Sequence, residues 1–114
     1  MPMTITESPR YSRVLNGIPA AWGCTTGPAA WGPLFPDTPF VLLARALTAD
    51  VAMTAILEGA VGVVSAAGGA TSHGAVLLRH HCIPCVSGVT ALEEVPSGVM
   101  LSVDGTKGEV SWSL

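Results

Sequence analysis

The chain has 114 residues, near the usual size of one domain built around a single hydrophobic core. Hydrophobic residues make up 49% of it and charged residues 11%, a composition that excludes an intrinsically disordered protein. The formal net charge is -3 with only 5 Lys and Arg, which leaves no basic surface for nucleic acid or an anionic membrane.

The first residues are polar and show no sustained periodicity. We therefore expect a loose N-terminal arm over residues 1–15 and one domain over residues 16–114. The arm lacks the apolar run of a secretion signal, and the longest apolar stretch, residues 51–70, is interrupted by Glu58 and several glycines. Three cysteines are too few for a disulfide framework. We therefore expect the protein in the cytoplasm by default.

The first half of the domain predicts strands and one helix. Residues 17–32 alternate small apolar residues with glycine and proline, as short strands joined by tight bends do. Residues 40–44 form an apolar run typical of a buried strand. Thr48 can cap a helix that Gly59 ends. The spacing predicts that its apolar face consists of Met53, Ile56 and Leu57.

The second half adds a strand over residues 61–64, a glycine-rich bend, and a helix from Thr71 or Ser72 to about His81. Pro84 breaks this helix before a strand over residues 85–87. Thr90 is expected to cap a short turn. The last sixteen residues predict a hairpin whose final strand places Val110, Trp112 and Leu114 on one face. The predicted fold class is therefore a single α/β domain.

The residues most suggestive of chemistry surround His73, where Gly68 and Gly69 precede Thr71 and Ser72 at the start of the second helix. Glycine lets the backbone approach a ligand, and the free amides of a first helical turn attract anions. The two hydroxyls can donate to phosphate oxygens. A neutral imidazole offers a nitrogen lone pair that can attack phosphorus. From these residues alone, an anion site and an ordinary histidine in a tight turn both remain open.

A longer pattern resolves this choice. The run from Gly68 to His73, followed by Arg79, Ile83-Pro84 and Gly88, closely resembles the mobile phosphohistidine domain of phosphoenolpyruvate (PEP)-utilising enzymes. That family includes pyruvate phosphate dikinase, PEP synthase and enzyme I of the sugar phosphotransferase system. The resemblance extends to spaced glycines and prolines in residues 17–28 and to residues 98–110.

The resemblance implies a swivelling β/β/α fold in which His73 accepts a phosphoryl group. Gly68, Gly69, Thr71 and Ser72 would position the phosphate, and Arg79 is a further candidate contact. No metal ligand is implied in this chain. Two departures from the family pattern are Ala66-Ala67 before the glycines and Cys82 where a glycine is expected at the helix end.

An ATP-binding domain and a PEP-binding barrel of roughly 250 residues do not fit within this chain. The resemblance therefore implies a partner, an ATP-binding or PEP/pyruvate-binding phosphotransferase, that holds Mg²⁺ and ATP or PEP. The expected function is that of a carrier subunit, a component of a phosphotransferase, which passes its phosphoryl group to a small acceptor such as pyruvate. The alternative is a non-catalytic interaction module, or a remnant of a PEP-utilising enzyme, that is not phosphorylated.

Two other patterns near the second helix have less support. Cys82 and Cys85 have the spacing of a redox pair, but they follow a helix, whereas a reactive pair sits at a helix start, where the thiol pKa is lowered. His80 and His81 could add zinc ligands to them, but adjacent histidines at a helix end point to different sides. We interpret these histidines as complementing the negative helix end.

Overall fold

From Ile18 on, the strands and helices follow the order that the apolar runs and turn residues predict. The structure, a computed structural model, describes residues 12–32 and 34–113. The elements are β1 (Ser12–Asn16), β2 (Ile18–Ala21), β3 (Cys24–Ala30), β4 (Phe40–Ala46), α1 (Ala49–Glu58), β5 (Ala60–Ala67), α2 (His73–His80), β6 (Cys85–Ser87), a 3-10 helix (Leu92–Glu94), β7 (Met100–Asp104) and β8 (Glu109–Ser113). Within the described ranges, no helix has the length and apolar character needed to cross a membrane.

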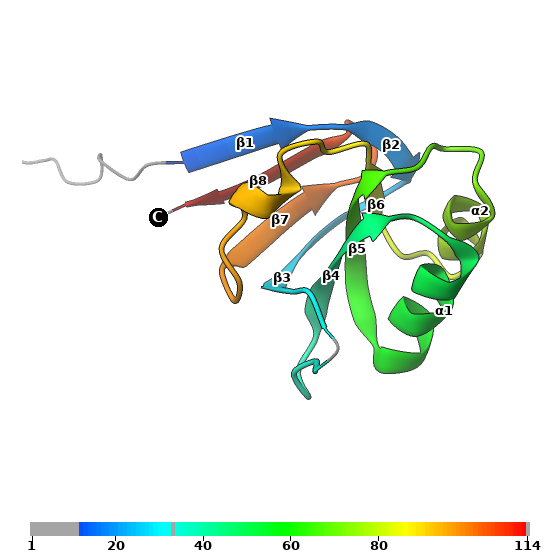
Figure 1. Ribbon diagram of the computed structural model, residues 1–114, viewed down its shortest axis with the longest axis horizontal. Coiled ribbons are helices and arrows are strands. Elements are labelled where there is room, and N and C mark those ends of the chain that lie inside the picture. Colours follow the sequence, from blue (N-terminus) through cyan, green and yellow to red (C-terminus); the bar gives the residue numbers. More distant parts are fainter. Residues whose placement is uncertain (1–11, 33, 114) are drawn as a thin grey trace, which may run out of the picture.

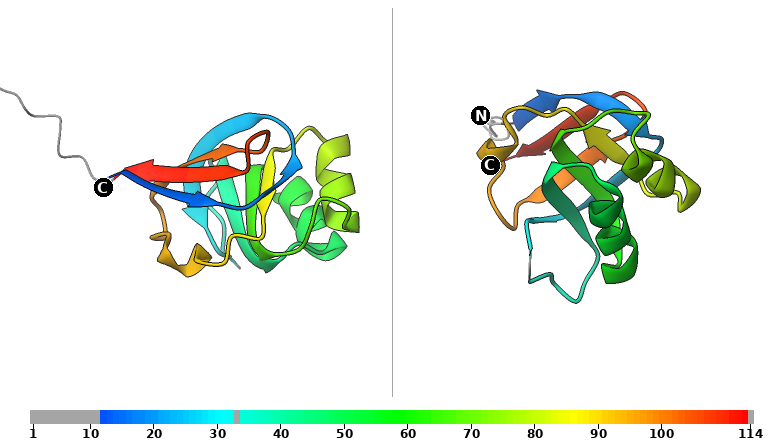
Figure 2. Two further views of the ribbon diagram at one scale, coloured as in Figure 1. Left: turned by 90° about the horizontal axis from the view of Figure 1, so that it is seen from above. Right: turned by 45° about the vertical axis from the view of Figure 1, so that its right-hand side comes forward.

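One eight-stranded sheet, in the order β1-β8-β7-β3-β4-β5-β6-β2, forms the body of the molecule (Figure 1). The pairs β3-β4, β4-β5 and β5-β6 are parallel, and the other neighbouring pairs in the sheet are antiparallel. β1 and β2 lie at opposite ends of this order, yet only Gly17 separates them in the chain. One continuous segment therefore pairs with both ends of the sheet and closes it, and the strands curve around a common interior (Figure 2).

Close backbone contacts hold the closing segment against the last hairpin. The Gly17 amide donates to the Gly108 carbonyl at 2.8 Å, and the Gly105 amide donates to the Gly23 carbonyl at 2.7 Å. A Cβ on Gly108 would lie 2.7 Å from the Gly17 carbonyl oxygen, and one on Gly105 would collide with the carbonyl of Ala21. The spaced glycines at the two ends of the sequence are therefore partners in one contact.

The sheet is covered on one side by α1 and α2 (Figure 1). Thr48 caps α1 by accepting the Val51 amide at 3.1 Å, and Gly59 ends it in the left-handed conformation at φ 83°. Both predictions from the sequence are confirmed.

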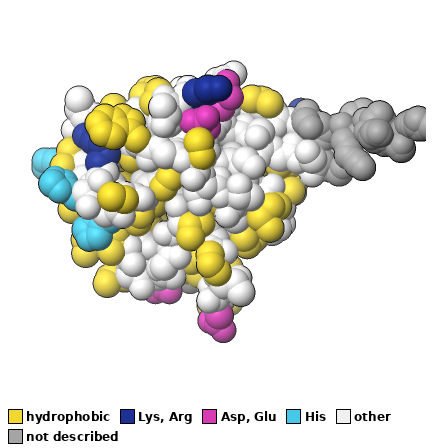
Figure 3. Space-filling model, turned by 180° about the vertical axis from the view of Figure 1, so that it is seen from behind, with side chains coloured by type: hydrophobic (Ala, Val, Ile, Leu, Met, Phe, Trp, Pro, Cys, Tyr) yellow, Lys and Arg dark blue, Asp and Glu magenta, His cyan; other side chains and the backbone are white. Residues whose placement is uncertain are grey.

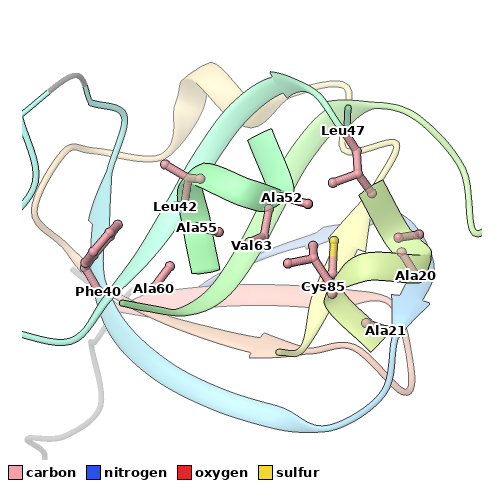
Figure 4. Close-up of a cluster of buried hydrophobic side chains, with 12 residues drawn as sticks. Ala20, Ala21, Phe40, Leu42, Leu47, Ala52, Ala55, Ala60, Val63 and Cys85 are labelled. Atoms are coloured by element: carbon pink, nitrogen blue, oxygen red, sulfur yellow. The ribbon is translucent and has the colours of Figure 1, made fainter. Parts of the chain in front are cut away.

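The predicted apolar face of α1 is wrong. Ala52 and Ala55 are the fully buried residues, whereas Leu57 is 75% exposed and Met53 is 42% exposed. Figure 4 shows Ala52 and Ala55 over the sheet beside Val63. Methyl side chains let the helix approach the sheet closely, and the long side chains of Met53 and Leu57 lie on the outside, whereas Ile56 is half-buried.

Alternate residues of the parallel strands contribute to two hydrophobic clusters. In β4 and β5, Leu42 and Val63 belong to the cluster under the helices (Figure 4). Leu43 and Val64 belong to the cluster on the other face of the strands. Burial on both faces explains the continuous apolar runs of these strands.

The predictions for the chain ends need correction. Residues 12–15 do not belong to a loose arm, because β1 pairs with β8 and Leu15 packs against the second cluster. The rest of the predicted arm, residues 1–11, lies outside the described residues, and so does Leu114. The short 3-10 helix has Ala91 at its N-cap with no side-chain bond, so Thr90 is not its cap. Val110 and Trp112 are both buried, which confirms that they share one face of β8.

Candidate functional site

His73 is the first residue of α2 and is exposed. Ser72 is the N-cap: its backbone is extended at φ -67° and ψ 158°, and its Oγ accepts the Ala75 amide at 3.2 Å. This bond satisfies one of the four amides that a helix start leaves without an intrahelical acceptor. The remaining amides of this first turn give the helix end its partial positive charge, and no acidic residue lies in the turn to oppose an anion.

Glycine occurs at positions 68 and 69, before the histidine, for two different structural reasons. Gly68 has φ 123°, and a Cβ there would lie 2.9 Å from Cβ of Leu47. The fold therefore requires glycine at this position. A Cβ on Gly69 would meet nothing within 4 Å. The glycine-rich loop is therefore open at Gly69. Thr71, which follows, is exposed.

Gly74, which sequence reasoning did not single out, brings the two helix starts together. A Cβ on Gly74 would lie 2.6 Å from the Thr48 carbonyl oxygen, at the N-cap of α1. A glycine inside a helix lowers helix propensity, so its presence directly after His73 was the signal that could have revealed this close contact.

The structure places Arg79 in the last turn of α2, with its side chain half-buried. Its Nη1 donates to the carbonyl of Ala20 at 2.6 Å and to the carbonyl of Ala70 at 2.8 Å. Arg79 therefore contacts the glycine-rich loop through a backbone oxygen.

Hydrogen bonds to a backbone oxygen hold the end of β5, where Ala66-Ala67 depart from the family pattern. The Ala67 carbonyl accepts the Leu47 amide at 2.9 Å and the Ser65 hydroxyl at 3.0 Å. The end of β5 is thereby fixed without polar side chains at these two positions.

The exposed face of α2 extends from His73 through Val76 to His80, which share one side of the helix by their spacing. Trp22, 78% exposed, stands beside this face and lines a shallow hollow of about 260 Å³ with Val76, Arg79 and His80. Figure 3 shows the histidines at one end of the molecule, next to hydrophobic side chains.

Cys82 and Cys85 do not form a reactive pair at neutral pH. Cys82 is exposed, whereas Cys85 is buried, and burial raises the pKa of the Cys85 thiol to about 12. Thiol exchange needs a thiolate, so this environment disfavours redox chemistry. In the described ranges, no three His, Cys, Asp or Glu side chains come close enough together to hold a metal ion. Nδ1 of His81 lies 3.1 Å from the Leu77 carbonyl oxygen, in keeping with a role at the helix end.

Taken together, an exposed imidazole stands at a helix start with open space in front of the preceding loop. Such an arrangement can present a nitrogen nucleophile to a phosphoryl group while helix amides stabilise the phosphate charge.

Comparison with known proteins agrees with this chemistry. A family model described as "PEP-utilising enzyme, mobile domain" matches residues 36–108. A phosphoenolpyruvate-protein phosphotransferase of Streptomyces coelicolor is 41% identical over 76 residues, covering 65% of this chain and 13% of that protein. The uncharacterized phosphotransferase YvkC of Bacillus subtilis is 30% identical over 100 residues, covering 83% of this chain and 12% of its own length. The chain thus spans only a small part of these relatives.

Solved structures of other proteins have a similar fold. The chain resembles an NMR structure of an Enzyme I protein with a TM-score of 0.56 and 34% identity, over 66% of this chain and 31% of that one. It also matches an aconitase X from Thermococcus kodakaraensis with a TM-score of 0.61 and 16% identity, over 90% and 98% of the two chains. The second likeness concerns the fold alone. The predicted α/β phosphohistidine-domain fold is confirmed.

Proposed function

Because the chain belongs to the family of PEP-utilising enzyme mobile domains, which takes part in phosphotransfer, we propose that it is a phosphohistidine carrier. In this proposal His73 takes a phosphoryl group at one site of a partner and delivers it to a small acceptor, such as pyruvate, at another. The observation that carries the proposal is the exposure of His73 at the capped start of α2, beside the open space at Gly69.

The transfer step conserves atoms and charge. The neutral ring nitrogen of His73 attacks phosphorus, and the P–O bond to the leaving group breaks. The leaving group is the nucleotide when ATP is the donor and the enolate of pyruvate when PEP is the donor. The ring proton goes to solvent. Gly68 shapes the loop, the open space at Gly69 admits the phosphate, and the hydroxyls of Thr71 and Ser72 donate to its oxygens. In such transfers the protein mainly positions groups and stabilises charge.

The partner would be an ATP-binding or PEP/pyruvate-binding phosphotransferase, which holds the donor and Mg²⁺. The exposed surface of Trp22, Val76 and His80 supports contact with a protein, because tryptophan is enriched among the residues that anchor protein interfaces. All three cysteines are free, which supports a cytoplasmic site for the reaction.

Intact-mass analysis of the protein tests the proposal directly. The protein is incubated with lysate of its source organism plus ATP or PEP, and its mass is measured at alkaline pH, where phosphohistidine survives. We expect an acid-labile gain of one phosphoryl group with one of the two donors, and no gain in His73→Ala. His81→Ala, at an exposed histidine outside the proposed contact surface, serves as the matched control and should gain the group as wild type does. A folded wild-type protein that gains nothing with either donor would favour the alternative, a non-catalytic interaction module.

A further inference from the structure

The guanidinium of Arg79 joins two segments that are far apart in the chain. Nη1 donates one bond to Ala20 in β2, at 2.6 Å, and another to Ala70 in the glycine-rich loop, at 2.8 Å. An Nη1 nitrogen carries two hydrogens, and both are committed to backbone carbonyls here. This nitrogen is therefore occupied by the protein itself.

Two carbonyl groups of the glycine-rich loop accept hydrogen bonds from the protein itself. The Ala70 carbonyl is held by Arg79, and the Gly69 carbonyl accepts the Ser72 amide at 3.2 Å. Carbonyl oxygens carry partial negative charge and repel phosphate oxygens, whereas amide hydrogens attract them. A loop whose two consecutive carbonyls have protein partners is suited to receive an anion.

We infer that Arg79 is a positioning residue for phosphorylation of His73: it acts by fixing the Ala70 carbonyl and the adjoining loop. This inference rests on the proposed function. It differs from the sequence prediction, in which the Arg79 side chain is a candidate contact for the phosphate. Charge alone does not fill a positioning role, because the rigid guanidinium plane fixes the directions of both Nη1 hydrogens, whereas a lysine ammonium turns on a flexible stem.

The histidines of α2 provide an internal comparison. Phosphoramidate, a small donor that needs no partner, phosphorylates imidazole: the ring nitrogen attacks phosphorus, the P–N bond breaks, and ammonia leaves with the proton that the imidazole loses. The folded protein is treated with phosphoramidate, and the early rates of phosphorylation at His73, His80 and His81 are measured by ³¹P NMR and peptide mass spectrometry. In wild type, His73 should react faster than the other two, which are exposed at the far end of the same helix.

Arg79→Met and Arg79→Lys are compared with Arg45→Met, a matched change at an exposed arginine at the end of β4. Hydrogen bonds from charged groups are strong enough that losing them should lower the ratio of His73 to His80 phosphorylation by about fivefold or more in both Arg79 variants. The control should keep the wild-type ratio. Near-UV circular dichroism establishes that each protein is folded, and Arg79→Lys, which keeps the aliphatic stem and the charge, serves if Arg79→Met does not fold.

Other outcomes have separate meanings. An unchanged ratio in a folded Arg79 variant would overturn the positioning role while leaving the proposed function intact. A loss in Arg79→Met that Arg79→Lys restores would assign Arg79 to direct charge contact and would also overturn it. A wild-type protein that shows no preference for His73 would contradict both the inference and the anion site on which the proposed function depends.

Discussion

Gly68 and Gly69 are adjacent, yet the structure predicts that alanine destabilises the fold at Gly68 and leaves its stability nearly unchanged at Gly69. Gly68→Ala adds a Cβ at a positive φ and against Leu47, so it should lower the free energy of unfolding by on the order of 1–3 kcal/mol. Gly69→Ala meets open space and should change stability by less than about 0.5 kcal/mol. Urea denaturation of both variants measures this difference.

Gly69→Ala should impair phosphorylation of His73 although it hardly changes stability. The added methyl in Gly69→Ala occupies the space proposed for the phosphate, so donor-driven phosphorylation of His73 should slow by about tenfold or more. A Gly69→Ala protein that is stable and reacts at the wild-type rate would show that the phosphate does not use this space.

Cys82 stands at φ 56°, a conformation that favours glycine, directly after α2. Cys82→Gly should raise the free energy of unfolding by about 0.5–1 kcal/mol, because relief of the left-handed backbone exceeds the added chain entropy of glycine. Cys82→Ala is the control: it removes the thiol, keeps the Cβ, and should give no gain. Equal stability of the two variants would show that the backbone at this helix end is not strained.

At the level of elements, local chemistry in the sequence was sufficient to predict helix ends. Thr48, Gly59 and Ser72 act within a few residues of themselves, and each occupies the cap expected of it or one of the positions proposed for it. The buried face of α1 could not be predicted in this way. Which face is buried depends on how closely the sheet and α2 approach, and that distance is set by Ala52 and Ala55.

The turn between β7 and β8 makes the stability of the folded state depend on pH. Asp104 Oδ1 accepts the Lys107 amide at 2.9 Å and the Thr106 amide at 3.0 Å. These amides, the Lys107 amide foremost, lower the pKa of Asp104. The carboxylate form therefore stabilises the folded state fully above about pH 4, and this contribution is lost as pH falls through the lowered pKa.

Asp104→Asn tests that dependence, because it keeps an acceptor oxygen and removes the titration. The difference in free energy of unfolding between wild type and variant should shrink as pH falls below about 4. A difference that stays constant through this range would contradict the role of the charge in the turn.

At the scale of the whole molecule, closure of the sheet was beyond sequence reasoning. The residues before Asn16 show no sustained periodicity and so suggested a free arm, but residues 12–15 pair with β8 from the far end of the chain. Pairing at such sequence separation leaves no local periodicity. The bonds of Arg79 to Ala20 and Ala70 were hidden for the same reason, since the backbone partners exist only in the closed fold.

The exposure of Trp22 predicts that this side chain belongs to the surface that docks to the phosphotransferase partner. Trp22→Ala should slow donor-driven phosphorylation of His73 by more than tenfold, because truncating a tryptophan anchor costs an interface about 2 kcal/mol. Leu57→Ala, at a residue 75% exposed on α1, is the matched control and should react as wild type does. Phosphoramidate should modify His73 equally in all three proteins. Equal donor-driven rates would exclude Trp22 from the docking surface.

The central claim is that phosphorylated His73 is an intermediate in transfer. The most direct measurement uses protein charged with labelled phosphate, freed of donor, and mixed with fresh lysate of the source organism and unlabelled small acceptors. The account predicts that the label moves to a small organic phosphate faster than it is released as inorganic phosphate in buffer alone. Label that leaves only as inorganic phosphate, at the buffer rate, would contradict the carrier role.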